Sequence, residues 1–224
     1  MTTKMSIGQE QQSVEIPIDH RILHGILNVP QDARGIVLFA HGSGSGRLSP
    51  RNQYVAGVLQ QAGMATLLFD LLDDEEAENR SKVFDIELLA QRLEATAVWT
   101  QERKESKGLR LGYFGASTGA AAALVAAARQ GNTVEAVVSR GGRPDLAKDA
   151  LQFVQAPTLL IVGGHDEPVV ELNRRALARL RCEKQLTIVP GATHLFVEPG
   201  ALEEVARLAS EWFQNHLPSS GPGH

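Results

Sequence analysis

The sequence predicts an α/β protein with a mostly parallel, doubly wound sheet of about eight strands, two antiparallel strands at the amino end and no cap domain. Two short alternating segments come first, and apolar strands then alternate with helices along the chain. The 224 residues are 43% hydrophobic and 21% charged, which suits one domain with a full core. Polar residues and glycines follow the apolar strands, where sheets of this kind bind ligands.

The first elements establish the sheet. Residues 13–18 and 22–29 alternate well enough to form an antiparallel pair. Residues 35–40 are a continuous apolar run, as expected of a strand buried on both faces, and they lead into a glycine-rich segment at 41–47. Ser49 and Pro50 then predict the start of a helix that continues to about Gln61.

The remaining elements follow the same alternation. Residues 71–85 hold an acidic run from Asp73 to Glu76, and we expect a solvated loop there rather than a cation site. Apolar strands are predicted at 64–69, 109–114, 134–138, 157–162 and 185–189. Helices are predicted at 86–102, 120–129, 146–153, 170–180 and 201–216, with residues 1–12 and 218–224 as flexible ends of a single domain at 13–217.

The pentapeptide Gly115-Ala116-Ser117-Thr118-Gly119 lies between an apolar strand and an alanine-rich helix. Strand, G-x-S-x-G and helix form the context of a nucleophile elbow, a strained turn that exposes a serine at the edge of the sheet. The helix begins at this turn, so its free N–H groups face any negative charge that develops beside Ser117. A tight strand–helix connection without a catalytic role would have the same residues. Whether Ser117 is a nucleophile therefore depends on the presence of a base and an acid elsewhere in the chain.

A serine hydroxyl needs a base to remove its proton, and the base needs an acid to fix its tautomer. Asp166 follows the strand at 157–162, and His194 follows the strand at 185–189. Ser117, Asp166 and His194 thus occur in the order Ser…Asp…His, each at the carboxyl end of a predicted strand. Glu167 and Asp145 are the alternative acids. We expect Ser117 as nucleophile, His194 as base and Asp166 as the acid.

Gly42, Ser43 and Gly44 follow the strand at 35–40. A glycine-rich turn at this point lets backbone N–H groups face the serine, and we expect the N–H groups of Ser43 and Thr118 to form an oxyanion hole, with Gly42 beside the substrate. A phosphate cradle is the competing interpretation, but neither the P-loop pattern nor G-x-G-x-x-G is present. No ligand spacing indicates a metal, and we expect no cofactor.

These motifs resemble those of the α/β-hydrolase superfamily and, within it, the dienelactone-hydrolase-like group of small lidless enzymes. The resemblance extends from about residue 14 to residue 216 and depends on the segments at 41–44, 115–119, 164–169 and 191–194. Dienelactone hydrolases proper have a cysteine nucleophile, and Ser117 stands at that position here. Residues 84–89 and 139–146 look like those of bacterial hydrolases that are sometimes fused to a phosphoribosyltransferase domain. The resemblance implies an α/β-hydrolase fold and a serine hydrolase.

The predicted function is hydrolysis of small carboxylic esters through an acyl-enzyme, as in carboxylesterases (EC 3.1.1). An acyltransferase, thioesterase or amidase with the same triad is one alternative, and a ligand-binding protein without turnover is another. Arg140 and Arg143 are candidates to favour anionic substrates, the alternatives being ion pairs with the acidic loop or plain solvation. We expect a shallow open cleft that favours acetyl to butyryl esters, because the chain leaves no room for a cap.

Composition limits the partners. The net charge of −4 is spread over both signs, which argues against nucleic acid as a partner, and no apolar run reaches the ~18 residues of a membrane helix. The sequence has one cysteine, Cys182, and its first residues have no apolar core of a signal peptide. We expect a cytoplasmic protein whose partner is a small-molecule ester, and a homodimer is compatible with the sequence.

Overall fold

A computed structural model describes residues 11–218 of the chain. Its strands form one sheet in the order β1-β2-β4-β3-β5-β6-β7-β8. β1 pairs antiparallel with β2 and β2 with β4, and all the other neighbouring strands are parallel. The strands are β1 (Gln12–Ile18), β2 (Arg21–Asn28), β3 (Gly35–Ala40), β4 (Met64–Phe69), β5 (Arg110–Ala116), β6 (Val134–Arg140), β7 (Thr158–Gly163) and β8 (Lys184–Val189).

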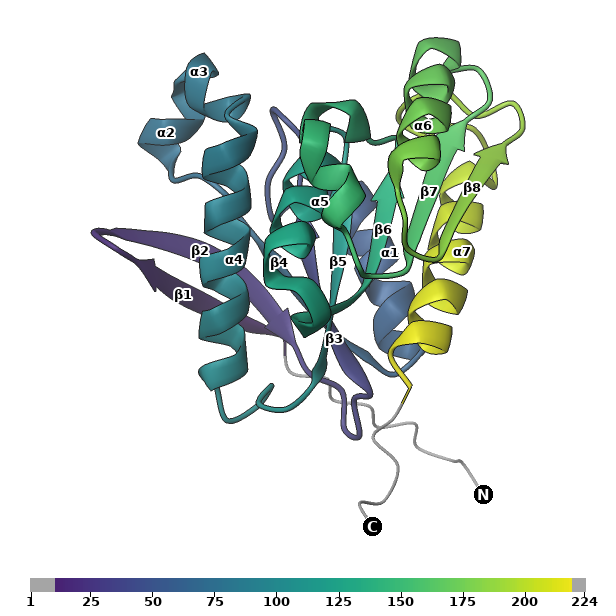
Figure 1. The fold of residues 1–224 in the computed structure, drawn as a ribbon. Coiled ribbons are helices and arrows are strands. Elements are labelled where there is room, and N and C mark those ends of the chain that lie inside the picture. Colours follow the sequence, from purple (N-terminus) through teal and green to yellow (C-terminus); the bar gives the residue numbers. More distant parts are fainter. Residues whose placement is uncertain (1–10, 219–224) are drawn as a thin grey trace, which may run out of the picture.

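Helices cover both faces of the sheet (Figure 1). Helices α4, α5 and α6 lie on one face, and α1 and α7 pack against each other on the opposite face. The helices are α1 (Pro50–Gln61), α2 (Asp74–Glu78), α3 (Arg80–Val83), α4 (Ile86–Glu102), α5 (Thr118–Gln130), α6 (Glu167–Arg179) and α7 (Ala201–His216), with 3-10 segments η1 (Gly131–Thr133) and η2 (Pro144–Phe153). Among residues 11–218 there is no separate cap domain, which confirms the predicted fold class.

The central strands are apolar throughout because both of their faces are covered. In β3 the side chains of Ile36 and Leu38 belong to the α4–α5 side of the core, and those of Val37 and Phe39 belong to the α1–α7 side. All six residues of β3 are buried, as are all six of β4 and of β7. This arrangement places the carboxyl ends of the parallel strands along one edge, where loops are free to carry functional side chains.

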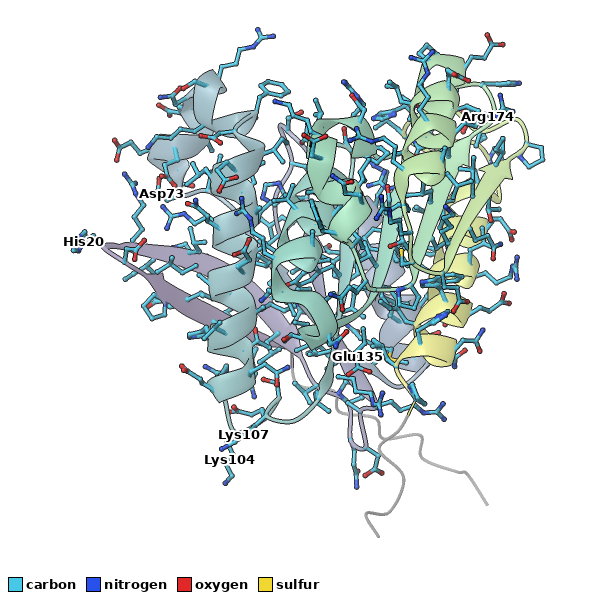
Figure 2. All side chains as sticks on the ribbon, viewed as in Figure 1. His20, Asp73, Lys104, Lys107, Glu135 and Arg174 are labelled. Atoms are coloured by element: carbon cyan, nitrogen blue, oxygen red, sulfur yellow. The ribbon has the colours of Figure 1, made fainter. Side chains whose placement is uncertain are left out.

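The expectation of a solvated loop at 71–85 is wrong, because the segment folds into α2 and α3. Asp73 caps α2 by accepting a hydrogen bond from the N–H of Glu76 at 2.9 Å, and Asn79 caps α3 through the N–H of Ser81. The sequence did not reveal these helices, because they are too short to show periodicity. Figure 2 shows Asp73 near the tip of the β1–β2 hairpin, which His20 marks.

Glu76 explains why this charged segment folds. Its side chain is only 3% exposed, and Oε1 lies 3.3 Å from Arg21 Nε, 3.2 Å from Lys82 Nζ and 3.4 Å from Arg92 Nη2. Arg21 comes from the start of β2 and also pairs with Asp73, so cations from three elements converge on one carboxylate. A carboxylate can be buried when enough donors surround it, and here the donors anchor α2 to the sheet and to α4.

The other elements lie within a few residues of their predicted positions, and α4, α7 and β4 have the predicted bounds. The predicted helix at 146–153 is a 3-10 segment, η2, with a break at Lys148, whose φ is 48°. Most of the two predicted flexible ends lies outside the described residues, and β1 already begins at Gln12. Within residues 11–218, no helix combines the length and the apolar composition that a bilayer crossing needs.

Candidate active site

Ser117 occupies a sharp turn between β5 and α5. Its φ of 50° and ψ of −120° are uncommon for a residue with a side chain, and such strain persists only where the surroundings impose it. The N–H of Ser117 donates to the carbonyl of Arg140 at 3.3 Å, and the carbonyl of Ser117 accepts from the N–H groups of Ala120 and Arg143. These hydrogen bonds hold the turn, which has the conformation expected of a nucleophile elbow.

The glycines of the pentapeptide allow the backbones to approach closely. A Cβ on Gly119 would lie 2.2 Å from the carbonyl oxygen of Ala40, and a Cβ on Gly115 would lie 2.4 Å from the Cα of Ala120. Residues from Thr118 to Ala127 are all buried, so α5 packs on the sheet through small side chains. The serine is therefore positioned by rigid elements on both sides, as a nucleophile requires.

Asp166 and His194 are brought together by adjacent loops after β7 and β8. His194 Nδ1 lies 2.6 Å from Asp166 Oδ2, with side chains 40% and 16% exposed respectively. The N–H of His165 donates to the carbonyl of Ala192 at 2.9 Å and ties the two loops together. With Nδ1 engaged by the carboxylate, Nε2 is the nitrogen that remains to exchange a proton.

Gly141 joins this pair to the serine turn. It follows β6, its φ is 53°, and a Cβ there would lie 3.6 Å from His194 Cε1. The preceding residue, Arg140, accepts the hydrogen bond from the N–H of Ser117, so the loop that contacts the imidazole is also bonded to the serine turn. The structure thus pairs Asp166 with His194 and links their loops to the serine turn through Gly141, while the role of the three residues as a triad stays a prediction.

The loop after β3 passes directly beside the serine. A Cβ on Gly42 would lie 2.9 Å from the Cβ of Ser117, so only glycine fits there. The N–H of Ser43 donates to Thr118 Oγ1 at 3.1 Å. Thr118 is the first residue of α5, and its own N–H has no partner within the helix. Both predicted oxyanion donors lie beside the turn, and one of them is engaged by a hydroxyl.

His41 fixes the start of this loop. The N–H of Leu71 donates to His41 Nε2 at 3.0 Å, so the ring proton resides on Nδ1, which lies 3.0 Å from the carbonyl of Gly42. Burial lowers the pKa of His41, which keeps the ring neutral. A neutral His41 therefore links the turn after β4 to the loop that carries Ser43.

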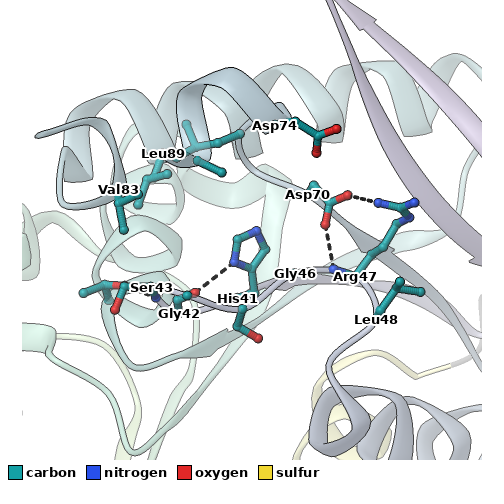
Figure 3. Close-up of a pocket in the computed structure, with 15 residues that line it drawn as sticks. His41, Gly42, Ser43, Gly46, Arg47, Leu48, Asp70, Asp74, Val83 and Leu89 are labelled. Atoms are coloured by element: carbon teal, nitrogen blue, oxygen red, sulfur yellow. Dashed lines mark hydrogen bonds and ion pairs between the residues drawn. The ribbon is translucent and has the colours of Figure 1, made fainter. Parts of the chain in front are cut away.

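A pocket of about 290 Å³ adjoins the serine turn on the α4 side of the sheet (Figure 3). Ser43 and Thr118 line one end of it. Val83 and Leu89 face the His41–Ser43 loop across the pocket, and Leu72 adds a further apolar wall. Ser117, Asp166 and His194 are not among the residues that line this pocket, whose walls include α3 and the start of α4. The shallow cleft expected beside Ser117 therefore stays a prediction.

Asp70 lies at the other end of the pocket, at the end of β4. It accepts a hydrogen bond from the N–H of Arg47 at 2.7 Å and pairs with the guanidinium of the same residue. This contact closes the loop that begins at His41. The sequence did not predict that residues 72–89 form walls of this pocket. The apolar residues within the acidic segment, such as Val83, were the signal that part of this segment packs against the rest of the protein.

The two candidate arginines have different surroundings. Arg143 forms a bidentate ion pair with Asp145, with both N–O distances at 2.8 Å, rather than with the acidic segment. Arg140 is 6% exposed and donates from Nη2 to Asn52 Oδ1 at 3.2 Å. Burial, together with the charge of Arg51, lowers the pKa of Arg140 to about 10. Substrate binding by either residue stays a prediction.

Comparison with known proteins agrees with this architecture. The model of the dienelactone hydrolase family matches residues 52–217. Curated proteins from two strains of Mycobacterium tuberculosis, CDC 1551 and H37Rv, are 60% identical over 214 residues and are named "Putative phosphoribosyl transferase". The match covers 96% of this chain and 48% of each relative, so the chain spans about half the length of the curated proteins it matches.

Solved structures give the same result. A structure described as dienelactone hydrolase from Anabaena variabilis is 57% identical, with a TM-score of 0.90, and the match covers 93% of this chain and 98% of that one. Est1E from Butyrivibrio proteoclasticus shares the fold at 16% identity and a TM-score of 0.78, with 92% and 98% of the two chains covered. The fold, the family match and the 57% identity together show that this chain belongs to the dienelactone hydrolase family of α/β-hydrolases.

Proposed function

We propose that the protein is a serine hydrolase that cleaves small carboxylic esters through an acyl-enzyme. The observation that carries the proposal is the 2.6 Å contact between Asp166 and His194, together with the strained nucleophile-elbow conformation of Ser117. Ser117 is the nucleophile, His194 the general base and Asp166 the group that orients the imidazole. Membership of a hydrolase family supports the same reaction class.

In the acylation step, His194 Nε2 accepts the proton of the Ser117 hydroxyl while Oγ attacks the ester carbonyl carbon. The carbonyl π electrons move to oxygen, and the oxyanion accepts a hydrogen bond from the N–H of Thr118 at the amino end of α5. The N–H of Ser43 becomes a second donor when the Thr118 hydroxyl turns away from it. Collapse of the intermediate breaks the C–O bond of the alcohol, which leaves with the proton from His194.

In the deacylation step, water replaces the alcohol and the same groups act again. His194 Nε2 takes a proton from water, the hydroxide oxygen attacks the acyl carbon, and the second tetrahedral intermediate expels Ser117 Oγ. The Ser117 oxygen recovers its proton from His194, and the carboxylic acid leaves. An acyltransferase, thioesterase or amidase would use the same acyl-enzyme with another acceptor or leaving group, so these remain alternative assignments.

We assign the activity in the printed name of the M. tuberculosis relatives to the part of those proteins that this chain does not cover. Just under half of each relative matches this chain, while the Anabaena variabilis hydrolase structure is matched over 98% of its length. A protein of this size is thus a complete hydrolase fold in that relative, and the remainder of the longer proteins is free to carry a second activity. We further propose that the protein acts in the cytoplasm.

The test is Ser117→Ala, assayed for repeated turnover of p-nitrophenyl acetate and for labelling by a fluorophosphonate probe. We expect less than a tenth of the activity to remain, one label per wild-type chain and none on the variant, because only Ser117 is activated by His194. The fold is expected to survive, since the side chain is small and lies at a turn. Ser13→Ala on the exposed face of β1 is the control. Retention of activity or of labelling in Ser117→Ala would remove the assignment.

A further inference from the structure

Arg140 is a buried cation for which residues 11–218 supply no carboxylate partner. Its residue exposure is 6%, Nε is buried without a hydrogen-bond partner, and the guanidinium bonds only to the neutral amide of Asn52 within residues 11–218. Buried charges in proteins are ordinarily paired, because an unpaired charge that has lost its water destabilises the folded state. Within the described part of the chain, the charge of Arg140 is thus left without a counterion.

A second arginine, Arg51, precedes the Asn52 that Arg140 contacts, and residues 11–218 supply it with no acidic partner either. Its Nε is buried and has no hydrogen-bond partner among these residues, and its charge helps to lower the pKa of Arg140. The first turn of α1 contains no acidic residue. Two like charges held together without a carboxylate repel each other, so the arrangement is stable only at a cost that a bound anion would remove.

The amino end of α1 adds to this positive region. Pro50 has no N–H, the N–H of Asn52 donates to Ser49 Oγ, and the N–H of Gln53 donates to the carbonyl of Ser49. The N–H of Arg51 is left without a partner within the helix. A 12-residue helix with a free N–H and its positive dipole end is a ready anion-binding element, and Arg140 donates to the Asn52 side chain in the same turn.

This region flanks the serine turn on the face opposite to the pocket. Side chains alternate along β6, so Arg140 points to the α1–α7 side together with Val138. The Arg140 guanidinium carbon lies 6.0 Å from the ring centre of Phe196, two residues after His194, and its carbonyl accepts the N–H of Ser117. Arg140 thus connects this region, on the α1 side, to the turn that carries Ser117 and to the loop that carries His194.

We propose that Arg140, Arg51 and the amino end of α1 form a subsite for a phosphate monoester group, and that the ester substrate carries such a group. The proposal rests on the proposed function and names its substrate class. Two guanidinium groups and a helix end supply more than two positive charges, which matches the charge of about −1.5 to −2 on a phosphate monoester better than the −1 of a carboxylate. Guanidinium forks also fit the paired oxygens of phosphate.

Binding is tested first, without catalysis. The melting temperature of the full chain is measured against inorganic phosphate, with chloride to hold the ionic strength constant, and against succinate. We expect a saturable rise with phosphate in both the wild type and Ser117→Ala, and a tenfold or greater weakening in Arg140→Gln and in Arg51→Gln. Arg207→Gln, whose charge is compensated by Glu204 and Glu211 on α7, is the matched control and should bind phosphate as the wild type does.

Several outcomes would overturn the subsite. These are a shift no larger than that with chloride, a shift that survives in Arg140→Gln and Arg51→Gln, or an equal response to succinate, which would indicate a carboxylate site. A loss in Arg143→Gln alone would place the anion elsewhere. If Arg140→Gln does not fold, the effect of Arg51→Gln on phosphate binding decides whether the subsite exists, because Arg51 is partly exposed and its substitution is better tolerated. Because Ser117→Ala retains the subsite, phosphate binding is informative even if the protein proves not to be a serine hydrolase.

The substrate class is tested by comparing 1-acetylglycerol 3-phosphate with 1-acetylglycerol and measuring the acetate released. We expect a higher kcat/KM for the phosphorylated ester, and a fall of tenfold or more in the ratio of the two values in Arg140→Gln. The ratio should be unchanged in Arg207→Gln. A wild-type ratio near one, or a ratio that does not move in Arg140→Gln and Arg51→Gln, would refute the proposed substrate class.

Discussion

At the scale of single residues, the candidate site depends on which carboxylate contacts which base. Asp166 meets His194 at 2.6 Å, whereas Asp145, an alternative acid in the sequence, is occupied by Arg143. Glu167, the other alternative, is exposed at the start of α6. The acid that orients a catalytic histidine must hold its ring nitrogen directly, and in the described structure Asp166 does so.

Asp166→Asn is therefore expected to lower kcat by about 10⁴-fold, because an amide presents the wrong hydrogen-bonding partner to the imidazole and favours the wrong tautomer. Asp145→Asn should cost less than tenfold, since it breaks only a half-exposed ion pair. Steady-state kinetics on p-nitrophenyl acetate with both variants gives the ranking. The opposite ranking would move the acid to the loop after β6.

His41 predicts a pH dependence of stability. Its pKa is lower in the folded protein than in the unfolded chain, so the unfolded chain binds the proton more readily. Its contribution to stability is complete above the ordinary histidine pKa of about 6.5 and decreases as the pH falls below it. Protonation also removes the acceptor for the N–H of Leu71.

We expect the free energy of unfolding to fall between about pH 7 and pH 5, and the fall to be smaller in His41→Asn. Urea titrations at several pH values measure it. His20→Asn at the tip of the β1–β2 hairpin is the control for an exposed histidine. An identical pH dependence in the wild type and His41→Asn would show that the buried imidazole is not the group responsible.

At the scale of elements, α2 and α3 form a wall of the pocket, and the buried carboxylate of Glu76 anchors this wall to β2 and α4. Ala77 and Val83 from this segment line the pocket, and Glu76 of α2 contacts Arg21, Lys82 and Arg92. Short helices of this kind have little intrinsic stability, so the ionic contacts and the packing on α4 decide their position. The pocket shape should therefore respond to Glu76.

Glu76→Gln is expected to destabilise the protein by about 3 kcal/mol, because three cations lose a buried partner. It should also raise KM more than it lowers kcat, since the wall moves while the catalytic groups stay. Glu75→Gln on the same helix is the matched control, with a side chain 85% exposed, and should change stability by less than about 0.5 kcal/mol. Hydrogen exchange over residues 73–85 locates the change. Equal effects of the two substitutions would contradict this role of Glu76.

At the scale of the whole molecule, the sheet separates two regions beside the serine turn. The apolar pocket lies on the α4 side, and the arginines lie on the α1 side. The volume of about 290 Å³ is at the lower end of ligand pockets, and the described residues include no cap domain that could extend it. Substrate length should therefore be limited by the pocket.

We expect kcat/KM to be highest for acetyl to butyryl esters and to fall for octanoyl and longer chains, because methylenes outside the pocket do not gain the ~0.8 kcal/mol of full burial. A series of p-nitrophenyl esters below and above the critical micelle concentration measures this. Leu89→Ala, which enlarges the pocket, should move the optimum to longer acyl chains. Rising activity up to palmitoyl esters, or a jump at the micelle threshold, would show that a lipid-binding surface has been overlooked.

The sequence by itself determined the order of the strands and of the longer helices, the serine turn and the strand ends that carry Asp166 and His194. These features are local, since an apolar run, a helix period and a G-x-S-x-G turn are each specified within about twenty residues. The need for glycine at Gly115 and Gly119 could also be predicted, because the close backbone approach at these positions is part of the turn motif.

Only the tertiary structure decided the rest. The fold of residues 71–85 depends on Arg21 and Arg92, which reach Glu76 from distant elements, so no local pattern could predict it. The different surroundings of the two candidate arginines also depend on the tertiary structure. Arg140 contacts Asn52 of α1, whereas Arg143 contacts Asp145. Ion pairs and pocket walls join residues that are far apart in the chain, and their energies depend on burial, which exists only once the sheet and its helices have packed.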